Sequence, residues 1–374
     1  APPRAAVAST PATRPAAAPP VASPARASAP KGFVQVPVLA VFDETPTIKT
    51  VRFVRPDGFD FLAGQFVAVR VRVEGKDQVR CYSISSDPHV RGYLEISVKR
   101  LGVVSNALHA TARPGGMLSV KAPAGAFRYP AGDDRPIVLL AGGVGITPLV
   151  SMLRHAVAHE PTRPVTLVYC ARGEAELAFR DDIKAMARRH PQVRVCFAVS
   201  QGSSDASVYP GRIDGSLLET AVSDLVHSLV FICGPTQMIR DMTALLARVG
   251  VPASQIRSEV FDAAAAAAAG LSRGGDAEMR APPPPRRSAG HRMTCARTGA
   301  EVPIRAGQTI LEAAEENGVP IESLCRAGVC GTCRVQVGAG EVECKSTTLD
   351  AADRDSGFVL ACVTTVKSDC TVSL

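Results

Sequence analysis

Four cysteines near the end of the chain constrain the fold more than any other sequence feature. Three lie in the segment Cys325-Arg-Ala-Gly-Val-Cys330-Gly-Thr-Cys333, and the fourth, Cys362, follows after 28 intervening residues. A tight loop of this kind brings three thiolates to one side, and a later strand supplies the fourth. Glycines inside the loop let the backbone curl and direct N–H groups toward the sulfur atoms. The spacing is typical of a [2Fe–2S] cluster.

A zinc site and a set of inert buried thiols are the alternatives to a cluster. Zinc sites favour two Cys-x2-Cys pairs or mixtures of cysteine and histidine, whereas this region has one such pair and no histidine nearby. Cys344 and Cys370 do not fit the ligand spacing and are expected to be ordinary cysteines. Cys170, Cys196 and Cys233 lie in apolar runs. This usage, without a signal-peptide pattern, is typical of reduced thiols in a cytoplasmic protein.

Two segments rich in alanine and proline divide the chain of 374 residues. Residues 1–31 have no apolar periodicity and are predicted to be a disordered arm. Residues 263–292, with seven consecutive alanines and four consecutive prolines, are predicted to be a flexible linker. Domains are therefore expected at 32–132, 133–262 and 293–374.

The net charge of +7 is unevenly distributed. Residues 33–262 carry 26 basic and 22 acidic side chains, and residues 294–374 carry 7 and 11. Much of the remaining basic excess lies in the arm and the linker rather than on a folded face, so nucleic-acid binding is not expected. The most apolar run, Ile137–Leu153, is interrupted by glycines and a proline and is too short to cross a membrane. We expect no membrane span, and we expect a monomer.

The pattern of strands and helices differs among the three expected domains. Five apolar segments between residues 34 and 99, separated by polar breaks, predict a small antiparallel β-barrel. From residue 135, apolar strands alternate with helical stretches, which predicts a parallel sheet with helices on both faces. The last domain contains short strands and a helix expected from about Thr309 to Asn317. The chain is thus predicted to combine a β-barrel, an α/β domain and an α+β domain.

The last domain resembles a plant-type ferredoxin along its whole length. Besides the cysteine loop, the resemblance is carried by Ala306-Gly-Gln-Thr-Ile-Leu-Glu-Ala-Ala before the loop and by Gly357-Phe-Val-Leu-Ala-Cys362 after it. One departure is Glu322-Ser-Leu ahead of the first cysteine, where the family often has serine directly before the ligand. The resemblance implies a β-grasp fold. It also implies the cluster ligands Cys325, Cys330, Cys333 and Cys362.

The segment Arg80-Cys-Tyr82-Ser83-Ile-Ser lies on a predicted strand and carries side chains suited to a bound cofactor. Alternation along the strand places Arg80 and Tyr82 on one face and Ser83 on the other. An arginine binds phosphate, a tyrosine packs against a ring or a ribose, and a serine donates a hydrogen bond to a ring nitrogen. By itself this short pattern is weak, and a surface strand is the alternative.

Together with a downstream loop, this strand resembles the ferredoxin–NADP reductase superfamily. The loop runs from Val98 to Ser105, and Ser105 is predicted to be the N-cap of a helix that ends near Ala112. A helix N-terminus favours phosphate. In this superfamily the Gly-x-x-Ser form goes with FAD, and FMN is the alternative because the loop is shorter than in many relatives. The implied flavin-binding residues are Arg80, Tyr82, Ser83, Val98, Lys99, Gly102, Val104 and Ser105.

A glycine turn after a predicted strand forms a candidate dinucleotide site. The segment Leu139-Leu-Ala-Gly-Gly-Val-Gly-Ile-Thr-Pro lacks the G-x-G-x-x-G pattern of ordinary dehydrogenases. Its form matches the same reductase superfamily, as does a Cys-Gly-Pro sequence at the end of a later strand. Ligands bind at the carboxyl ends of such strands. The implied nicotinamide-nucleotide residues are Gly142, Gly143, Gly145, Thr147, Pro148, Cys233, Gly234 and Pro235.

The same resemblance implies which residues lie closest to the reacting rings. Ser83 and Cys233 are implied to position the flavin and nicotinamide rings, and Glu259 to belong to the same site. In relatives an aromatic residue at the place of Phe261 packs beside the isoalloxazine. The alternatives are a buried thiol at Cys233 and a core-capping Phe261. Arg172 ends a strand where an arginine can bind adenosine phosphate, but NADH is favoured over NADPH because many NADH-dependent relatives carry arginine there.

The order of the three modules resembles the electron-transfer reductases of bacterial oxygenases. The resemblance implies that NADH reduces FAD, that FAD passes single electrons to the [2Fe–2S] cluster, and that the cluster reduces an acceptor protein such as an oxygenase component. The alternative is a soluble redox fragment of a larger membrane-associated electron-transfer protein. A pure iron–sulfur sensor is disfavoured because it needs neither nucleotide signature. Opposite charges on the two nucleotide-binding domains and the ferredoxin domain predict that they dock electrostatically.

Overall fold

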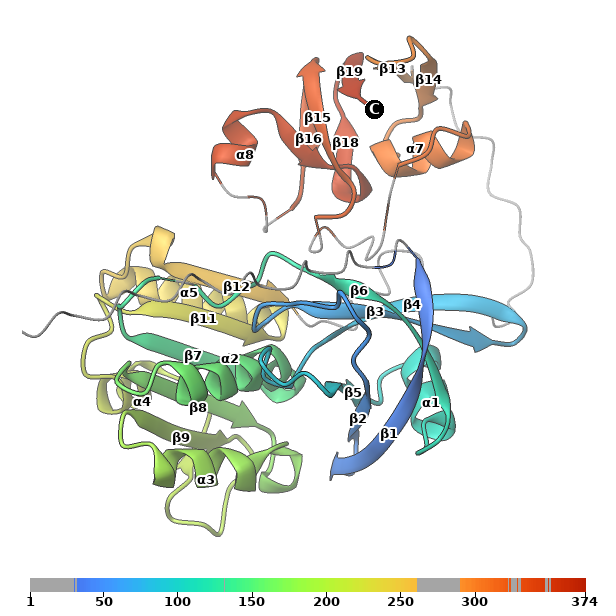
Figure 1. Ribbon diagram of the computed structural model, residues 1–374. Coiled ribbons are helices and arrows are strands. Elements are labelled where there is room, and N and C mark those ends of the chain that lie inside the picture. Colours follow the sequence, from blue (N-terminus) through green and yellow to red (C-terminus); the bar gives the residue numbers. More distant parts are fainter. Residues whose placement is uncertain are drawn as a thin grey trace, which may run out of the picture.

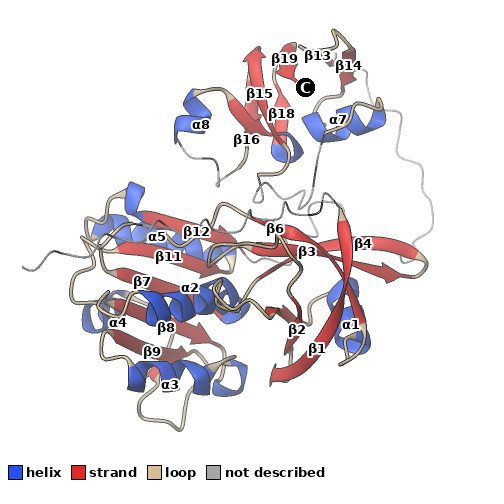
Figure 2. Ribbon diagram, viewed as in Figure 1, coloured by secondary structure: helices blue, strands red, loops and turns tan. Residues whose placement is uncertain are grey.

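The structure is a computed structural model that describes residues 30, 32–130, 132–260, 290–321, 323, 328, 331–346, 349 and 351–374. Nearly all of the predicted arm and of the predicted linker therefore lies outside the described residues. Figure 1 shows three folded units that follow one another along the chain, and Figure 2 shows the helices gathered mainly in the second unit.

The first unit is an antiparallel sheet of six strands that closes on itself. Its strands, in the order β4-β3-β6-β1-β2-β5, are β1 (Phe33–Thr45), β2 (Ile48–Val54), β3 (Phe66–Val73), β4 (Lys76–Ser83), β5 (Tyr93–Lys99) and β6 (Met117–Ala124). A bridge between Ile84, just beyond β4, and Ile96 of β5 joins the two ends of the sheet. Side chains such as Phe53 and Val69 fill the interior. The predicted antiparallel barrel is thus confirmed.

Helix α1 (Val103–Thr111) begins earlier than the sequence predicts. Its N-cap is Gly102, not Ser105. The Ser105 hydroxyl instead accepts the backbone N–H groups of Leu101 and Gly102, each at 2.9 Å. The predicted N-cap was therefore wrong, because a serine three residues into a helix can satisfy the backbone from inside the first turn.

The second unit is a parallel sheet with the strand order β10-β9-β8-β7-β11-β12. Its strands are β7 (Ile137–Gly142), β8 (Val165–Ala171), β9 (Val193–Val199), β10 (Tyr209–Pro210), β11 (Leu229–Gly234) and β12 (Ile256–Val260). Its helices are α2 (Ile146–His159), α3 (Arg180–Arg189), α4 (Gly215–Ala221) and α5 (Thr236–Arg248). Neighbouring residues of β7 enter different cores, Leu139 with Leu149 of α2 and Leu140 with Leu217 of α4. Helices therefore cover both faces, as predicted.

The third unit is a mixed sheet with the strand order β14-β13-β19-β15-β17, beside a separate two-stranded pair. Its strands are β13 (His291–Cys295), β14 (Glu301–Ile304), β15 (Arg334–Ala339), β16 (Val342–Cys344), β17 (Phe358–Leu360), β18 (Thr364–Val366) and β19 (Cys370–Ser373). Helix α7 (Ile310–Glu316) begins after a capping box in which Thr309 and Glu312 bond each other's backbone N–H. Helix α8 (Ala351–Asp355) precedes β17.

The start of β13 corrects one predicted boundary. His291 pairs with Ile304 of β14, so the strand begins two residues inside the stretch predicted to be linker. Met293 and Cys295 are fully buried and point to the same side of the strand, which ties this end of the segment to the core. Composition alone did not reveal this, because the strand contains few apolar residues.

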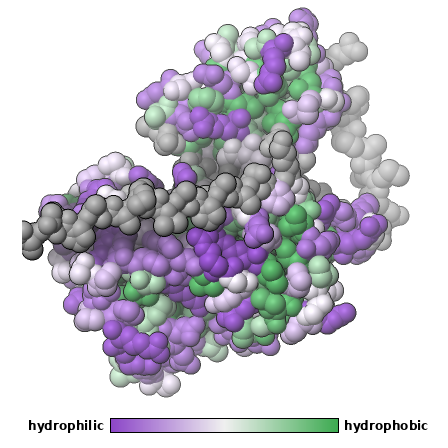
Figure 3. All heavy atoms as spheres, viewed as in Figure 1, coloured by the Kyte–Doolittle hydropathy of each residue, from purple (hydrophilic) through white to green (hydrophobic). Residues whose placement is uncertain are grey.

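Large exposed apolar side chains gather on the barrel. Figure 3 shows apolar surface over this unit, whereas the visible face of the second unit is largely hydrophilic. The exposed apolar residues of the barrel are Leu39, Phe42, Leu62, Leu101, Val103 and Met117. No helix among the described residues is long and apolar enough to cross a membrane.

Candidate functional site

The carboxyl ends of β7 and β11 meet where the strand order of the parallel sheet reverses. From β7 the chain proceeds outward through β8 and β9, and it returns to β11 on the other side of β7. Open α/β sheets bind ligands at such a point. Gly142, the last residue of β7, packs against Gly234 and Pro235 at the end of β11. The structure therefore brings together the two segments that the sequence predicts to bind nicotinamide nucleotide.

Gly145 approaches the end of β11 so closely that no larger residue fits. A β-carbon at this position would lie closer than 3.0 Å to the backbone carbonyl of Cys233. Gly145 is also the N-cap of α2, where Thr147 Oγ1 donates a hydrogen bond to the Val144 carbonyl at 3.0 Å and Pro148 occupies the first turn. The glycine turn thus presents the start of a 14-residue helix beside Cys233, and helix starts favour phosphate.

Cys233 is fully buried beside Glu259, its partner in the register of β11 and β12. Glu259 is itself only 6% exposed. Burial, and to a lesser extent the charge of Glu259, raises the pKa of the Cys233 thiol well above its usual value. The thiol is therefore neutral at physiological pH and offers an uncharged, polarisable contact to a ring. Phe261, the residue after β12, lies outside the described residues.

Strand β4 carries the predicted flavin-binding side chains. Ser83 is buried, whereas Arg80 and Tyr82 are half-buried. Burial raises the pKa of the Tyr82 hydroxyl, so this group stays protonated. Arg80 donates a hydrogen bond to the carbonyl of Val79 at 2.8 Å and forms no ion pair within the described part of the chain. Its positive charge is therefore suited to a phosphate of the flavin.

The predicted phosphate loop offers mainly its backbone. The side chains of Val98 and Val104 are buried in the barrel, so only their backbone groups are placed to reach a ligand. Gly102 and Ser105 form the start of α1. Lys99, at the end of β5, reaches across to the second unit, where its Nζ lies 3.8 Å from the Glu176 carboxylate.

The Glu176 carboxylate lies close to two predicted cofactor-binding residues, Lys99 and Arg172. The same carboxylate that faces Lys99 also pairs with Arg172, whose Nε lies 3.0 Å from Glu176 Oε1. Arg172 is largely exposed just beyond the end of β8. The structure thus places Arg172 just beyond the carboxyl end of β8, the neighbour of β7, and it places a negative charge directly against its guanidinium.

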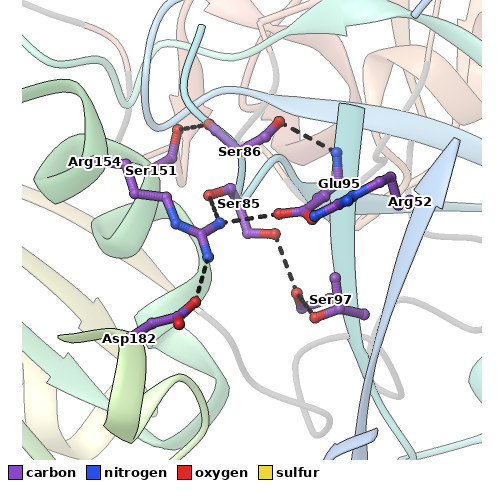
Figure 4. A network of polar contacts seen from close by, with 9 residues as sticks. Arg52, Ser85, Ser86, Glu95, Ser97, Ser151, Arg154 and Asp182 are labelled. Carbon is purple, nitrogen blue, oxygen red and sulfur yellow. Dashed lines mark hydrogen bonds and ion pairs between the residues drawn. The ribbon is translucent and has the colours of Figure 1, made fainter. Parts of the chain in front are cut away.

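The flavin strand, β4, is followed by Ser85 and Ser86, which α2 holds in place through contacts that the sequence did not predict. Figure 4 shows this polar network, in which Ser151 Oγ donates to the Ser86 carbonyl at 2.7 Å and Arg154 donates to the Ser85 carbonyl at 2.8 Å. Arg154 also pairs with the buried carboxylate of Glu95 at 3.0 Å. Polar residues three apart on the buried face of an otherwise apolar helix were the available signal.

Two of the four predicted cluster cysteines lie in the described part of the chain. Cys333 immediately precedes β15 and Cys362 closely follows β17, and antiparallel pairing of these strands brings their ends together. The N–H of Ala361 donates to the carbonyl of Cys333 at 2.9 Å, and both cysteines are buried. Cys325 and Cys330 lie outside the described residues.

The loop backbone fits a cluster as well. Gly328 and Gly331 have positive φ angles of 73° and 74°, which glycine adopts readily. The Ser346 hydroxyl holds the Gly328 carbonyl at 2.9 Å. Two glycines with positive φ next to two converging cysteines suit the four-thiolate donor set of a [2Fe–2S] cluster.

Comparison with known proteins agrees with this geometry. Residues 44–129 match the oxidoreductase FAD-binding domain, residues 139–244 the oxidoreductase NAD-binding domain, and residues 293–367 the 2Fe-2S iron-sulfur cluster binding domain. The glycine betaine monooxygenase reductase subunit of Chromohalobacter salexigens is 31% identical over 352 residues, covering 90% of this chain and 94% of that protein.

Two further proteins resemble this chain over most of its length. NADH oxidoreductase HCR of Escherichia coli is 30% identical over 86% of this chain and 92% of its own length. The structure of phthalate dioxygenase reductase, described as modular for electron transfer from pyridine nucleotides to [2Fe-2S], has a TM-score of 0.55 at 23% identity, covering 92% of this chain and 98% of that one. This last likeness concerns the fold alone.

These findings define an NAD(P)H-dependent flavin oxidoreductase of the ferredoxin–reductase type. The chain belongs to the family of FAD- and NAD-binding reductases that carry a C-terminal [2Fe–2S] ferredoxin domain. Its electrons pass from the nicotinamide nucleotide through FAD to the cluster. The first, second and third units are accordingly called the FAD, NAD and ferredoxin domains.

Proposed function

We propose that this reductase uses NADH and delivers electrons to the oxygenase component of an oxygenase system. The observation that carries the proposal is the match with the glycine betaine monooxygenase reductase subunit, which runs through all three domains and nearly the whole of that protein. An oxygenase needs electrons one at a time, whereas a nicotinamide nucleotide gives them in pairs. A chain that holds both a flavin and a one-electron cluster is suited to convert the electron pair from the nucleotide into single electrons.

The setting of Arg172 favours NADH over NADPH. Recognition of the NADPH 2′-phosphate requires an arginine whose charge is available. Here the guanidinium of Arg172 faces Glu176 at 3.0 Å. The carboxylate neutralises the arginine and repels a phosphate placed beside it. The likeness to a protein named NADH oxidoreductase points the same way.

The side chains of this chain would bind and orient the two nucleotides. When bound, FAD accepts a hydride from the nicotinamide and releases single electrons, which the cluster carries onward. In the proposal, Arg80 holds a flavin phosphate, Tyr82 packs against the flavin, and Ser83 donates a hydrogen bond to its ring. Cys233 contacts the nicotinamide as a neutral thiol, and Glu259 beside it helps to fix that position.

Two measurements test the two parts of this proposal. Stopped-flow reduction of the flavin should be faster, at equal concentrations, with NADH than with NADPH, and Glu176→Gln should narrow that preference. A faster reaction with NADPH would overturn the nucleotide assignment. The oxygenase subunit of a glycine betaine monooxygenase should turn over when NADH and this reductase are supplied. Cytochrome c reduction without any oxygenase turnover would instead overturn the assigned partner.

A further inference from the structure

Three histidines and an aspartate gather where the loop after the flavin strand meets α2. Asp87 and His89 lie in that loop, and His155 and His159 lie one turn apart on the helix. One side-chain ligand atom from each residue lies within 4.8 Å of the others. None of the four belongs to the flavin, nicotinamide or cluster sites described above.

The contacts within this group centre on the carboxylate of Asp87. His89 Nδ1 lies 3.3 Å from one carboxylate oxygen, and His159 Nε2 lies 3.3 Å from the other. The ring centroids of His89 and His159 are 3.6 Å apart, and the ring of His155 stacks 5.3 Å from that of His89. Nδ1 of His155 is buried without a hydrogen-bond partner among the described residues. Three imidazoles therefore crowd one carboxylate.

Hydrogen bonds from α2 hold the loop that carries Asp87 and His89 against the helix independently of any ligand. Ser151 and Arg154 bind the carbonyls of the two serines that precede Asp87. His155 follows Ser151 by one helical turn and His159 by two, so all three lie on one face of α2. The face of the helix that docks on the loop is thus the face that presents both histidines.

We propose that Asp87, His89, His155 and His159 form a zinc site that joins the FAD domain to the NAD domain. Imidazole and carboxylate are zinc ligands, and four of them complete a closed tetrahedral site. Histidines four residues apart on one helix face are a recurrent zinc-binding arrangement. The histidines also lie near the C-terminus of α2, where the helix dipole favours a cation.

Zinc binding requires only small side-chain movements. Bonds of about 2.0–2.1 Å in a tetrahedral site place the ligand atoms roughly 3.3 Å apart. His89 and His159 are exposed, so solvent leaves room for their rings to turn toward that spacing, whereas Asp87 and His155 are half-buried. Because the ligands come from both domains, bound zinc ties the loop after the flavin strand to the helix that begins at the nicotinamide turn.

Titration of the intact holoenzyme with zinc chloride tests the site. With FAD and the cluster in place, calorimetry should show one zinc ion per chain bound by these side chains. His159→Ala and Asp87→Asn should each weaken zinc binding at least about tenfold, since loss of a ligand exceeds the usual effect of losing an outer hydrogen-bond partner. His227→Ala is the matched control, because His227 also pairs with an aspartate, at 2.8 Å, but is exposed elsewhere on the NAD domain. Equal zinc affinity in His159→Ala and His227→Ala would overturn the proposal.

A spectroscopic measurement separates this site from zinc bound by cysteines. The zinc-edge X-ray absorption of the loaded wild type should show nitrogen and oxygen near about 2.0 Å with imidazole scattering. A sulfur shell near about 2.3 Å would place the zinc on thiolates and overturn the proposal. Zinc should also raise the unfolding temperature of the wild type and of His227→Ala but not that of His159→Ala.

Discussion

The NAD domain and the ferredoxin domain both place buried cysteines at their predicted sites, yet in different backbone settings. Cys233 stands alone at the end of a parallel strand, where burial keeps its thiol neutral. Cys333 and Cys362 come from adjoining ends of two antiparallel strands, next to a loop of glycines with positive φ. The comparison teaches that the backbone around a cysteine sets the chemistry for which it is suited: an isolated buried thiol stays neutral, and converging thiols are suited to bind metal.

Replacing a cluster cysteine should have the largest effect. In Cys362→Ser the four-thiolate donor set is incomplete, so the iron content should fall from about two per chain to nearly none. Cytochrome c reduction should be lost while NADH still reduces the flavin. Iron analysis and anaerobic absorbance measure both results. Cys344→Ser, a half-buried cysteine outside the ligand spacing, is the matched control, and full iron content in Cys362→Ser would contradict the assignment.

The glycine turn should tolerate no side chain. In Gly145→Ala the new β-carbon clashes with the carbonyl of Cys233, and the clash should cost about 1–3 kcal/mol of stability, as overpacking does. Flavin reduction by NADH should slow as the start of α2 shifts. Thermal unfolding and stopped-flow absorbance check these effects. Gly173→Ala is the control, because its β-carbon meets nothing within 4 Å and its φ of −143° suits any residue. Equal behaviour of the two variants would refute the close-packing argument.

Removing the lone thiol should slow hydride transfer without changing its pH dependence. In Cys233→Ala the reduction of the flavin by NADH should be about tenfold slower, because small displacements of reacting groups have effects of this size. Since burial raises the pKa of the Cys233 thiol, the group stays protonated as pH rises from 6 to 9. Rates of flavin reduction across that range should therefore give parallel profiles for the variant and the wild type. A wild-type inflection that disappears in Cys233→Ala would show that a thiolate takes part.

A substitution at the interface between the FAD and NAD domains should have a smaller effect than a substitution at either cysteine site. Arg154→Met removes the donor to the Ser85 carbonyl and one partner of the buried Glu95, which should cost about 1–3 kcal/mol. Thermal unfolding monitored by flavin fluorescence measures this loss. Arg135→Met breaks only an exposed ion pair with Asp133 and should leave stability nearly unchanged. If the two variants unfold alike, the network of Figure 4 does not stabilise the interface.

Salt should have the smallest effect, confined to the step between the domains. The opposite net charges of residues 33–262 and 294–374 predict electrostatic docking. Raising the ionic strength from about 0.05 M to about 1 M should therefore slow cluster reduction severalfold. The preceding flavin reduction in the same stopped-flow trace serves as the internal reference. A rate of cluster reduction that does not change with salt would remove the docking hypothesis.

The sequence predicts most where the chemistry is local. The cysteine loop and the glycine turn are each contained in about ten residues; spacing pointed to the first, and resemblance to a reductase superfamily pointed to the second. The N-cap of α1 was misplaced because Ser105 satisfies the backbone from inside the helix. Arg154 and the histidine group were not predicted, because their partners lie about 60 residues or more away in another domain. A local pattern can mark a polar residue on a buried helix face, but its partners depend on how the domains pack.

One measurement tests the three-centre route most directly. Protein with about one FAD and about two irons per chain is titrated anaerobically with NADH while visible absorbance is recorded. The route predicts that the flavin and cluster absorbance bleach together, and that Cys362→Ser retains only the flavin change. Bleaching of the flavin while an intact cluster stays oxidised would contradict the route, because the electrons would then remain on the flavin and would not reach the ferredoxin domain.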